Sequence, residues 1–251
     1  MVIRESEEQG SLDNGLEDQA GTDPNNVYKG FLNSSNCDVA VKKILKNSEQ
    51  GPREYGAEIR ILSSLRHRNL VQLLGWCHEK EMLLVYEFMR KGSLDSHLFK
   101  GGSLLSWEIR YRIAQGLASV LMYIQHEWDQ YVVHRDIKSS NIMLDSKFSP
   151  KLGDFGLTRF VDHDKSSKTT IIVGTRGYMA PEYITENKAS KHTDIFSFGV
   201  VALEIACGRK PFDHRLGRDK FNMVEWVWEL YKGGNVIEAA DPKLGVTYDR
   251  R

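Results

Sequence analysis

The chain has 251 residues, of which 41% are hydrophobic and 27% are charged, a composition typical of one large folded domain or two lobes. Its 34 basic and 34 acidic side chains cancel to a net charge of zero, which argues against nucleic acid or an anionic membrane as a general partner. The three cysteines, Cys37, Cys77 and Cys207, are odd in number and far apart, which favours a reducing, cytoplasmic compartment. The longest apolar run, 196–207, is too short to cross a bilayer.

The beginning of the chain changes character near residue 26. Residues 1–25 contain many acidic and few large apolar side chains, so we expect an acidic, disordered tail there. The stretches 27–32 and 38–45 are short and rich in β-branched residues, and a polar turn separates them, which predicts two neighbouring strands. Pro52 then opens a stretch with apolar residues at helical spacing, which predicts a helix.

The remaining elements divide the chain into two parts. Two apolar runs, 70–77 and 82–89, predict buried strands, and a helical apolar stripe follows over 107–128. Strands with a single helix followed by helices predict an α+β protein with two lobes. We expect a small β-rich lobe and hinge at 26–89 and a larger, mainly α-helical lobe at 90–251.

Four short motifs carry most of the functional signal. They are "VAVK" at 39–42, "HRD" at 134–136, "GDFG" at 153–156 and "APE" at 180–182. Each occurs by accident in many chains, but the four in this order at this spacing resemble the motif set of protein kinases. The resemblance runs from Val27 to the end of the chain.

Longer strings narrow the resemblance. "HRNLVQLLGWCHE", "LLVYEFM", "VVHRDIKSSN" and "SFGVVALEIACGRKP" look most like the plant receptor-like kinases with legume (L-type) lectin domains. That family implies a bilobal kinase fold that transfers the γ-phosphate of ATP to serine or threonine hydroxyls of proteins with Mg²⁺. It implies the cytoplasmic face of the plasma membrane if the chain is part of a longer receptor. It also implies further helices after Arg251, so we expect an incomplete and less stable large lobe.

The chemistry of phosphoryl transfer suits the residues in these motifs, because it needs positioning and charge neutralisation more than covalent catalysis. Asp136 is the candidate base for the attacking hydroxyl, and Lys138 is placed to reach the transferred phosphoryl group. Asn141 and Asp154 offer the hard oxygen ligands that Mg²⁺ prefers. We therefore expect Asp136 and Lys138 to be catalytic and Asn141 and Asp154 to hold the metal.

A lysine on a strand is often only a surface group, and Lys42 alone would be interpreted in that way. Glu58 favours a functional interpretation of Lys42 over a surface one. It lies on the apolar stripe of the predicted helix, where an acid is costly to bury without a cation. We therefore expect a Lys42–Glu58 ion pair, which in the family helps to hold the α- and β-phosphates.

The resemblance alone assigns the rest of the nucleotide pocket: Val27, Ala40, Glu87, Met89 and Met143. It also implies that Tyr86 lies at the back of the adenine pocket and that Asp194 braces the catalytic loop. His134 and Phe155 are expected to pack together with Leu62 above them, although each could equally be an ordinary core residue.

Two residues favour serine or threonine over tyrosine as the acceptor. Lys138 has the form found in serine/threonine kinases, and Thr175 occupies the matching place before "APE". Arg135, directly before Asp136, is positioned to pair with a phosphate on the activation segment. That segment offers the candidate autophosphorylation sites Ser166, Ser167, Thr169 and Thr170, each of which could also be a solvated hydroxyl.

The glycine-rich phosphate loop of the family is missing. Ala20, Thr22 and Asn25 stand where its glycines belong, with Asp23 and Pro24 between them. Losing two charge-assisted hydrogen bonds to phosphate weakens binding by roughly 3 to 6 kcal/mol. The alternative interpretation is therefore a weakly active or inactive kinase-fold protein that binds partners as a scaffold.

Overall fold

The structure is a computed structural model, and it describes residues 27–46, 48–126, 130–162, 172–217 and 220–245. The predicted acidic tail and the altered phosphate loop both fall before residue 27, outside the described residues. The four candidate autophosphorylation hydroxyls, at positions 166, 167, 169 and 170, fall outside them as well.

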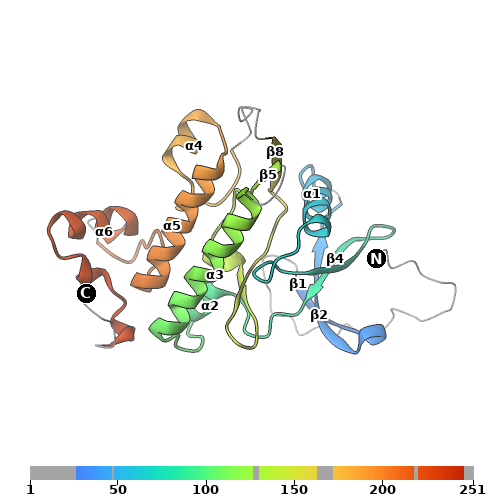
Figure 1. Cartoon of the computed structure of the whole chain (residues 1–251), viewed down its shortest axis with the longest axis horizontal. Coiled ribbons are helices and arrows are strands. Elements are labelled where there is room, and N and C mark those ends of the chain that lie inside the picture. The colour runs from blue at the N-terminus through green and yellow to red at the C-terminus, as the bar shows by residue number, and fades with distance from the viewer. Residues whose placement is uncertain (1–26, 47, 127–129, 163–171, 218–219, 246–251) are drawn as a thin grey trace.

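The small lobe is a four-stranded antiparallel sheet with one helix (Figure 1). The strands are β1 (Val27–Leu32), β2 (Cys37–Ile44), β3 (Leu73–Cys77) and β4 (Met82–Glu87), in the order β1-β2-β4-β3. Helix α1 (Gly51–Ser64) has a proline in its first turn and contacts β2, β3 and β4. The small β-rich lobe expected from the sequence is confirmed.

The turn and the third strand show how the chain departs from simple strand patterns. Residues Asn33–Ser35 form a 3₁₀ turn, and Asn36 follows with φ 47°, a left-handed conformation that asparagine tolerates. The strand predicted from residue 70 begins only at Leu73. Before it, Leu70 forms a bridge with Leu152, and the Val71 N–H donates to the Leu152 carbonyl at 3.0 Å, so this stretch joins the two lobes.

The large lobe is mainly helical, as expected. Its helices are α2 (Leu94–Phe99), α3 (Trp107–His126), α4 (Pro181–Glu186), α5 (Lys191–Cys207) and α6 (Met223–Lys232). Helices α3 and α5 run side by side through its centre (Figure 1). Short 3₁₀ turns at Val236–Ala239 and Pro242–Leu244 follow α6.

Two short ladders between the lobes carry the segments with the catalytic motifs. Strand β5 (Gln130–Val133) pairs with β8 (Arg159–Asp162), and β6 (Ile142–Leu144) pairs with β7 (Pro150–Leu152). The 3₁₀ turn Ser139–Asn141 leads directly into β6. The loops between these strands are therefore fixed at both ends, which positions the side chains between them.

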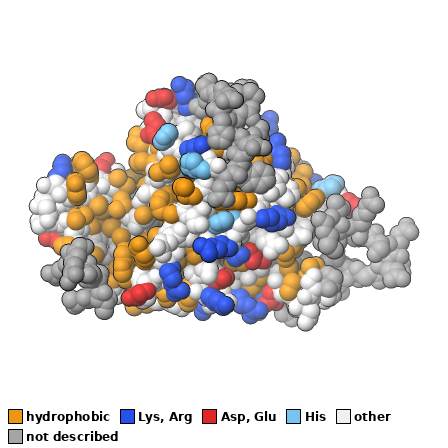
Figure 2. All heavy atoms as spheres, viewed as in Figure 1, with side chains coloured by type: hydrophobic (Ala, Val, Ile, Leu, Met, Phe, Trp, Pro, Cys, Tyr) orange, Lys and Arg blue, Asp and Glu red, His pale blue; other side chains and the backbone are white. Residues whose placement is uncertain are grey.

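A single apolar core joins the lobes, because Ile61 and Leu84 of the small lobe belong to the same buried cluster as Leu117, Ile142 and Phe155. On the outside, hydrophobic side chains gather over the side of the molecule that carries α6 (Figure 2). Trp228 and Tyr231 of α6 are 57% and 62% exposed. No helix within the described ranges combines the length and apolar character needed to cross a bilayer.

Candidate functional site

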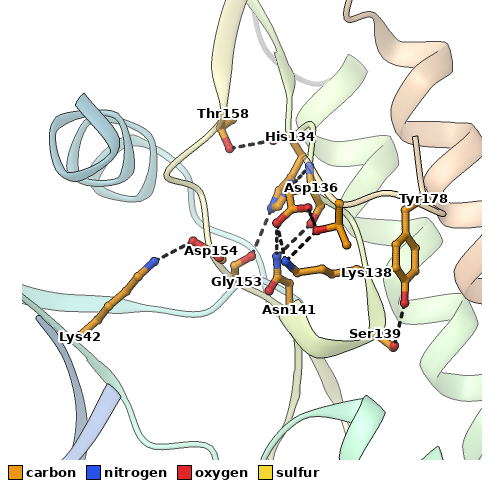
Figure 3. A network of polar contacts seen from close by, with 11 residues as sticks. Lys42, His134, Asp136, Lys138, Ser139, Asn141, Gly153, Asp154, Thr158 and Tyr178 are labelled. Carbon is orange, nitrogen blue, oxygen red and sulfur yellow. Dashed lines mark hydrogen bonds and ion pairs between the residues drawn. The ribbon is translucent and has the colours of Figure 1, made fainter. Parts of the chain in front are cut away.

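The predicted Lys42–Glu58 ion pair is present and includes a third residue. The Lys42 ammonium lies 3.2 Å from Oε2 of Glu58 and 2.7 Å from Oδ1 of Asp154. Lys42 comes from β2 and Glu58 from α1, while Asp154 follows β7 in the other lobe. Figure 3 shows the lysine extending from the sheet toward Asp154. One ammonium thus connects the sheet, the helix and the large lobe.

The two carboxylates differ in exposure and in charge behaviour. The Glu58 side chain is only 1% exposed, and burial raises its pKa despite the nearby Lys42. The Asp154 side chain is 39% exposed, and although burial acts to raise its pKa, Lys42 holds the pKa below its ordinary value. Burial acts to lower the pKa of Lys42, but the two carboxylates outweigh it and raise the pKa. Asp154 is therefore the more accessible carboxylate of the group.

The backbone at Asp154 is fixed by contacts on both sides. Asp154 has φ 61°, and the next N–H, that of Phe155, donates to Oε1 of Glu58 at 3.2 Å. The Phe155 ring packs edge-on against the His134 ring at a centroid distance of 4.6 Å. Leu62 and Phe155 share one buried cluster. These contacts agree with the packing implied by the kinase resemblance.

His134 is a buried neutral imidazole, because burial lowers its pKa. Its Nε2 lies 3.2 Å from the Gly153 carbonyl, which can only accept, so Nε2 carries the proton. The other nitrogen, Nδ1, accepts the Asp136 N–H at 3.3 Å. His134 therefore connects the two loops that contain Asp136 and Asp154.

Asp194 braces the catalytic loop through the backbone. Its two carboxylate oxygens accept the His134 N–H at 2.7 Å and the Arg135 N–H at 2.9 Å. Burial raises the pKa of Asp194 to about 7 in spite of these hydrogen bonds. The brace holds Arg135 at φ 70°, a left-handed conformation that aims the following Asp136 into the site.

Both oxygens of the Asp136 carboxylate have partners. Oδ1 accepts the Thr175 hydroxyl at 2.6 Å. Oδ2 lies 2.8 Å from the Lys138 ammonium and accepts the Asn141 amide at 3.1 Å. Lys138 also donates to the Thr175 hydroxyl at 3.0 Å. Figure 3 shows Asp136, Lys138 and Asn141 meeting at one point below His134.

The oxygens of Asn141 and Asp154 fit a hard divalent cation. The Asn141 amide group donates to the Asp136 carbonyl at 2.9 Å and to its carboxylate, which leaves the amide oxygen as the atom for a metal. Asp154 uses Oδ1 for Lys42 and keeps Oδ2. Two such oxygens suffice for Mg²⁺, which takes its other ligands from phosphates and water.

The remaining predicted pocket residues line up along the sheet and hinge. Val27 pairs with Lys42 across β1 and β2, so Val27, Ala40 and Lys42 share one face of the sheet. The Glu87 side chain is engaged with Lys151 at 2.8 Å and with the Gln72 N–H at 2.9 Å, and the Glu87 N–H donates to the Gln72 carbonyl at 3.1 Å.

The other three pocket residues are Met89, Met143 and Tyr86. Met89 follows β4 and is 8% exposed, and Met143 lies on β6 against the core. Tyr86 is buried, and burial together with the nearby Glu58 raises its pKa. Met89 and Met143 thus supply apolar side chains at the hinge and on β6.

Three hydrogen bonds around Tyr178 were not predicted from the sequence. The Tyr178 hydroxyl donates to Oε1 of Glu204 at 2.6 Å and lies 3.4 Å from the Ser139 hydroxyl, while the Ser197 hydroxyl donates to the Tyr178 carbonyl at 2.6 Å. We call residues 175–180 the docking segment. Glu204 is fully buried, and burial raises its pKa to about 8. An acid inside the apolar run 196–207 was the available signal, as it was for Glu58.

Arg135 and Glu182 lie on either side of the activation segment in the sequence, and neither side chain forms an ion pair within the described residues. Arg135 donates from Nε and Nη2 to the Leu157 carbonyl, and the hydroxyls expected to pair with it when phosphorylated fall outside the described ranges. Burial and the nearby Arg159 lower the pKa of Arg135. Glu182 of the "APE" motif is exposed and has no ion pair in the part of the chain that the structure describes.

Comparison with known proteins agrees with this geometry. The family model for the protein kinase domain matches residues 23–237. The chain is 57% identical over 223 residues to L-type lectin-domain containing receptor kinase IX.1 of Arabidopsis thaliana, covering 88% of this chain and 34% of that protein. It is 54% identical to kinase IX.2 of the same plant over 235 residues, covering 90% and 35%.

A third relative comes from another plant. The chain is 49% identical over 220 residues to L-type lectin-domain containing receptor kinase SIT2 of Oryza sativa subsp. japonica, covering 87% of this chain and 33% of that protein. The chain thus spans about a third of the length of the curated relatives it matches. With the two-lobed fold, these findings establish that the chain belongs to the protein kinase domain family.

Proposed function

We propose that this chain is a serine/threonine protein kinase that uses ATP and Mg²⁺ and works in receptor-like signalling at the cytoplasmic face of the plasma membrane. The observation that carries the proposal is the convergence of four side chains from both lobes: Lys42, Asp136, Asn141 and Asp154. The similarity to plant receptor kinases supports the signalling context.

Nucleotide binding follows from the face of the sheet and from the hinge. Val27 and Ala40 would cover the adenine, and the backbone of Glu87 and Met89 would pair with it. Lys42 would bind the α- and β-phosphates while Glu58 holds the ammonium in place. Mg²⁺ would neutralise phosphate charge with Asn141 and Asp154 as its protein ligands.

Proton transfer falls to Asp136. The acceptor oxygen forms a bond to the γ-phosphorus, the bond from that phosphorus to the β–γ bridging oxygen breaks, and the hydroxyl proton passes to Asp136. The 2.6 Å contact with the Thr175 hydroxyl supports this role, because Oδ1 already accepts a hydrogen bond from an aliphatic hydroxyl. Lys138, 2.8 Å from the same carboxylate, would stabilise the negative charge on the transferred group.

The choice of serine or threonine is supported by the Lys138–Thr175 contact at 3.0 Å. The pair lies against the Asp136 carboxylate, which both side chains contact. It positions a short aliphatic hydroxyl near the carboxylate, which matches the acceptor class implied by both residues in the sequence.

The test compares the wild type with Asp136→Asn. We expect both proteins to bind Mg·ATP with the same affinity, and we expect the variant to phosphorylate itself and a generic protein substrate about 10² to 10⁴ times more slowly. Calorimetry and a radiolabel assay measure the two properties. If the wild type binds no nucleotide at millimolar concentration, the kinase proposal fails, and the scaffold interpretation suggested by residues 20–25 replaces it.

A further inference from the structure

Ionisable side chains from two parts of the large lobe meet beside the docking segment. Asp95 lies on α2, Glu204 on α5, and Lys100 and Lys210 follow those two helices. Lys100 and Lys210 both act to lower the pKa of Asp95, and Lys210 acts in the same direction on Glu204. Lys210 therefore lies near both acids, and Glu204 contacts Tyr178 of the docking segment.

The two acids of this cluster, Asp95 and Glu204, already have hydrogen-bond or ion-pair partners. Asp95 is 9% exposed, and its carboxylate lies 2.7 Å from the Lys100 ammonium and accepts the Ser93 hydroxyl at 2.5 Å. Glu204 is fully buried behind the Tyr178 hydroxyl, which donates to it at 2.6 Å. A basic side chain of a bound protein would find neither carboxylate available.

Two basic side chains in this region, Arg176 and Lys210, are available to a bound protein segment. Arg176 directly follows Thr175, is exposed, and makes no hydrogen bond or ion pair with any residue that the structure describes. Lys210 is also exposed and has no ion pair among those residues, and its ammonium lies 5.8 Å from the centre of the Phe99 ring. Pro211, the residue after Lys210, packs against Gly177 of the docking segment. The docking segment and its neighbour therefore offer two basic side chains that form no ion pair with the described residues.

We propose that the site selects protein segments with acidic residues flanking the acceptor hydroxyl, and that Arg176 and Lys210 recognise that charge. This inference rests on the proposed kinase function and names the substrate class of the same site. Acidic flanks would gain charge-assisted contacts with two exposed cations that lose little hydration on pairing. Basic flanks would meet like charges, and the nearby acids already have partners. We therefore expect basic flanks to be disfavoured by about as much as acidic flanks are favoured.

The test uses three acceptor peptides that are identical except for the residues around one serine: neutral, acidic (Glu) or basic (Lys). We expect kcat/KM to follow the order acidic, neutral, basic, with about three- to tenfold between steps, as for one or two charge pairs near a protein surface. The ratio of kcat/KM for the acidic and neutral peptides should fall at high ionic strength. Salt screens the attraction between exposed charges, with a Debye length of about 10 Å at 0.1 M that shortens as salt is added.

Charge reversal identifies the residues responsible. We expect Arg176→Glu and Lys210→Glu each to lower the acidic-to-neutral ratio of kcat/KM about three- to tenfold, by the same reasoning. The neutral peptide corrects for any general loss of activity. The matched control is Lys232→Glu at the end of α6, an exposed lysine paired with Glu229 at 2.6 Å, which should leave the ratio unchanged.

The outcomes separate the two proposals. Equal rates on all three peptides, or a preference for the basic one, overturn the inference and leave the kinase function intact. Absence of turnover on every peptide, together with absence of autophosphorylation, overturns both. Fluorescence anisotropy of the labelled peptides needs no turnover, and Kd values that do not follow the acidic, neutral, basic order also overturn the inference.

Discussion

Arg110 and Asp241 form a buried ion pair between positions 131 residues apart, with Nη2 2.6 Å from Oδ2. Their side chains are 2% and 4% exposed. Arg110 also donates to the carbonyls of Leu105 at 3.1 Å and Ile205 at 2.7 Å. The pair therefore attaches the residues after α6 to the start of α3 and the end of α5.

Removing one partner of this pair leaves the other as a buried unpaired charge. We expect Arg110→Met and Asp241→Asn each to lower the free energy of unfolding by about 3 to 5 kcal/mol. Urea denaturation measures the loss. The double variant should lose less than the sum of the two, and strictly additive losses would show that the residues are not coupled. Glu229→Gln, in an exposed pair with Lys232, serves as the control with no measurable loss.

Lys42→Met should affect both stability and turnover. The substitution leaves Glu58, 1% exposed, without its cation, and we expect a loss of about 3 kcal/mol in unfolding free energy. We expect phosphorylation to fall below detection, because the phosphate contact disappears with the ammonium.

A second substitution separates these two effects. In Lys42→Met/Glu58→Gln the buried acid is neutral, so we expect part of the stability to return while turnover stays absent. Thermal unfolding and the radiolabel assay measure the two properties on the same preparation. Recovery of turnover in the double variant would mean that Lys42 acts only through Glu58 and does not contact the nucleotide.

Thr175 positions the docking segment through its hydroxyl, which contacts both Asp136 and Lys138. We expect Thr175→Val, which keeps the shape and removes the hydroxyl, to lower kcat on a peptide substrate about tenfold, since a net hydrogen bond contributes about 1 kcal/mol and more when one partner is charged. Thr175→Ser keeps the hydroxyl and should retain most activity. Equal losses in both variants would assign the effect to packing.

Glu204 makes the stability depend on pH. Its pKa rises from 4.5 to about 8 on folding, so between these values the folded state holds a proton that the unfolded state has released. The free energy of unfolding should therefore fall as pH rises from about 4.5 to 8, by roughly 3 to 5 kcal/mol from this group. Urea denaturation at several pH values measures the fall.

Glu204→Gln is the control for this pH dependence, because the amide keeps the shape and cannot titrate. Asp194, with a pKa raised from 3.8 to about 7, contributes a fall of the same sign in both proteins. The difference between the two profiles therefore isolates Glu204. Parallel profiles would show that Glu204 has the same pKa in the folded and unfolded states.

The sequence predicted the fold and the Lys42–Glu58 ion pair because those signals are local or depend on a strong burial penalty, whereas the contact of Lys42 with Asp154 was not predicted. Strands β1 and β2 follow β-branched runs of the predicted length, and Glu58 stood out as an acid on an apolar helical stripe. The same reasoning applied to Glu204 within 196–207 would have predicted a buried partner, although it could not have named Tyr178.

Other contacts could not be predicted, because they depend on how distant segments meet. Nothing near Arg110 in the sequence points to Asp241, and nothing in the run from residue 70 shows that Leu70 pairs with Leu152 in the other lobe. The ladders β5–β8 and β6–β7 contain three or four residues per strand, too few for a period-two pattern to emerge.

The position of Lys42 between Glu58 and Asp154 has a thermodynamic consequence. A nucleotide phosphate that shares this ammonium binds well only while α1 stays against the sheet, so the nucleotide and the position of α1 are linked. By reciprocity, any ligand or protein that moves α1 outward weakens nucleotide affinity by the same factor by which the nucleotide opposes that movement.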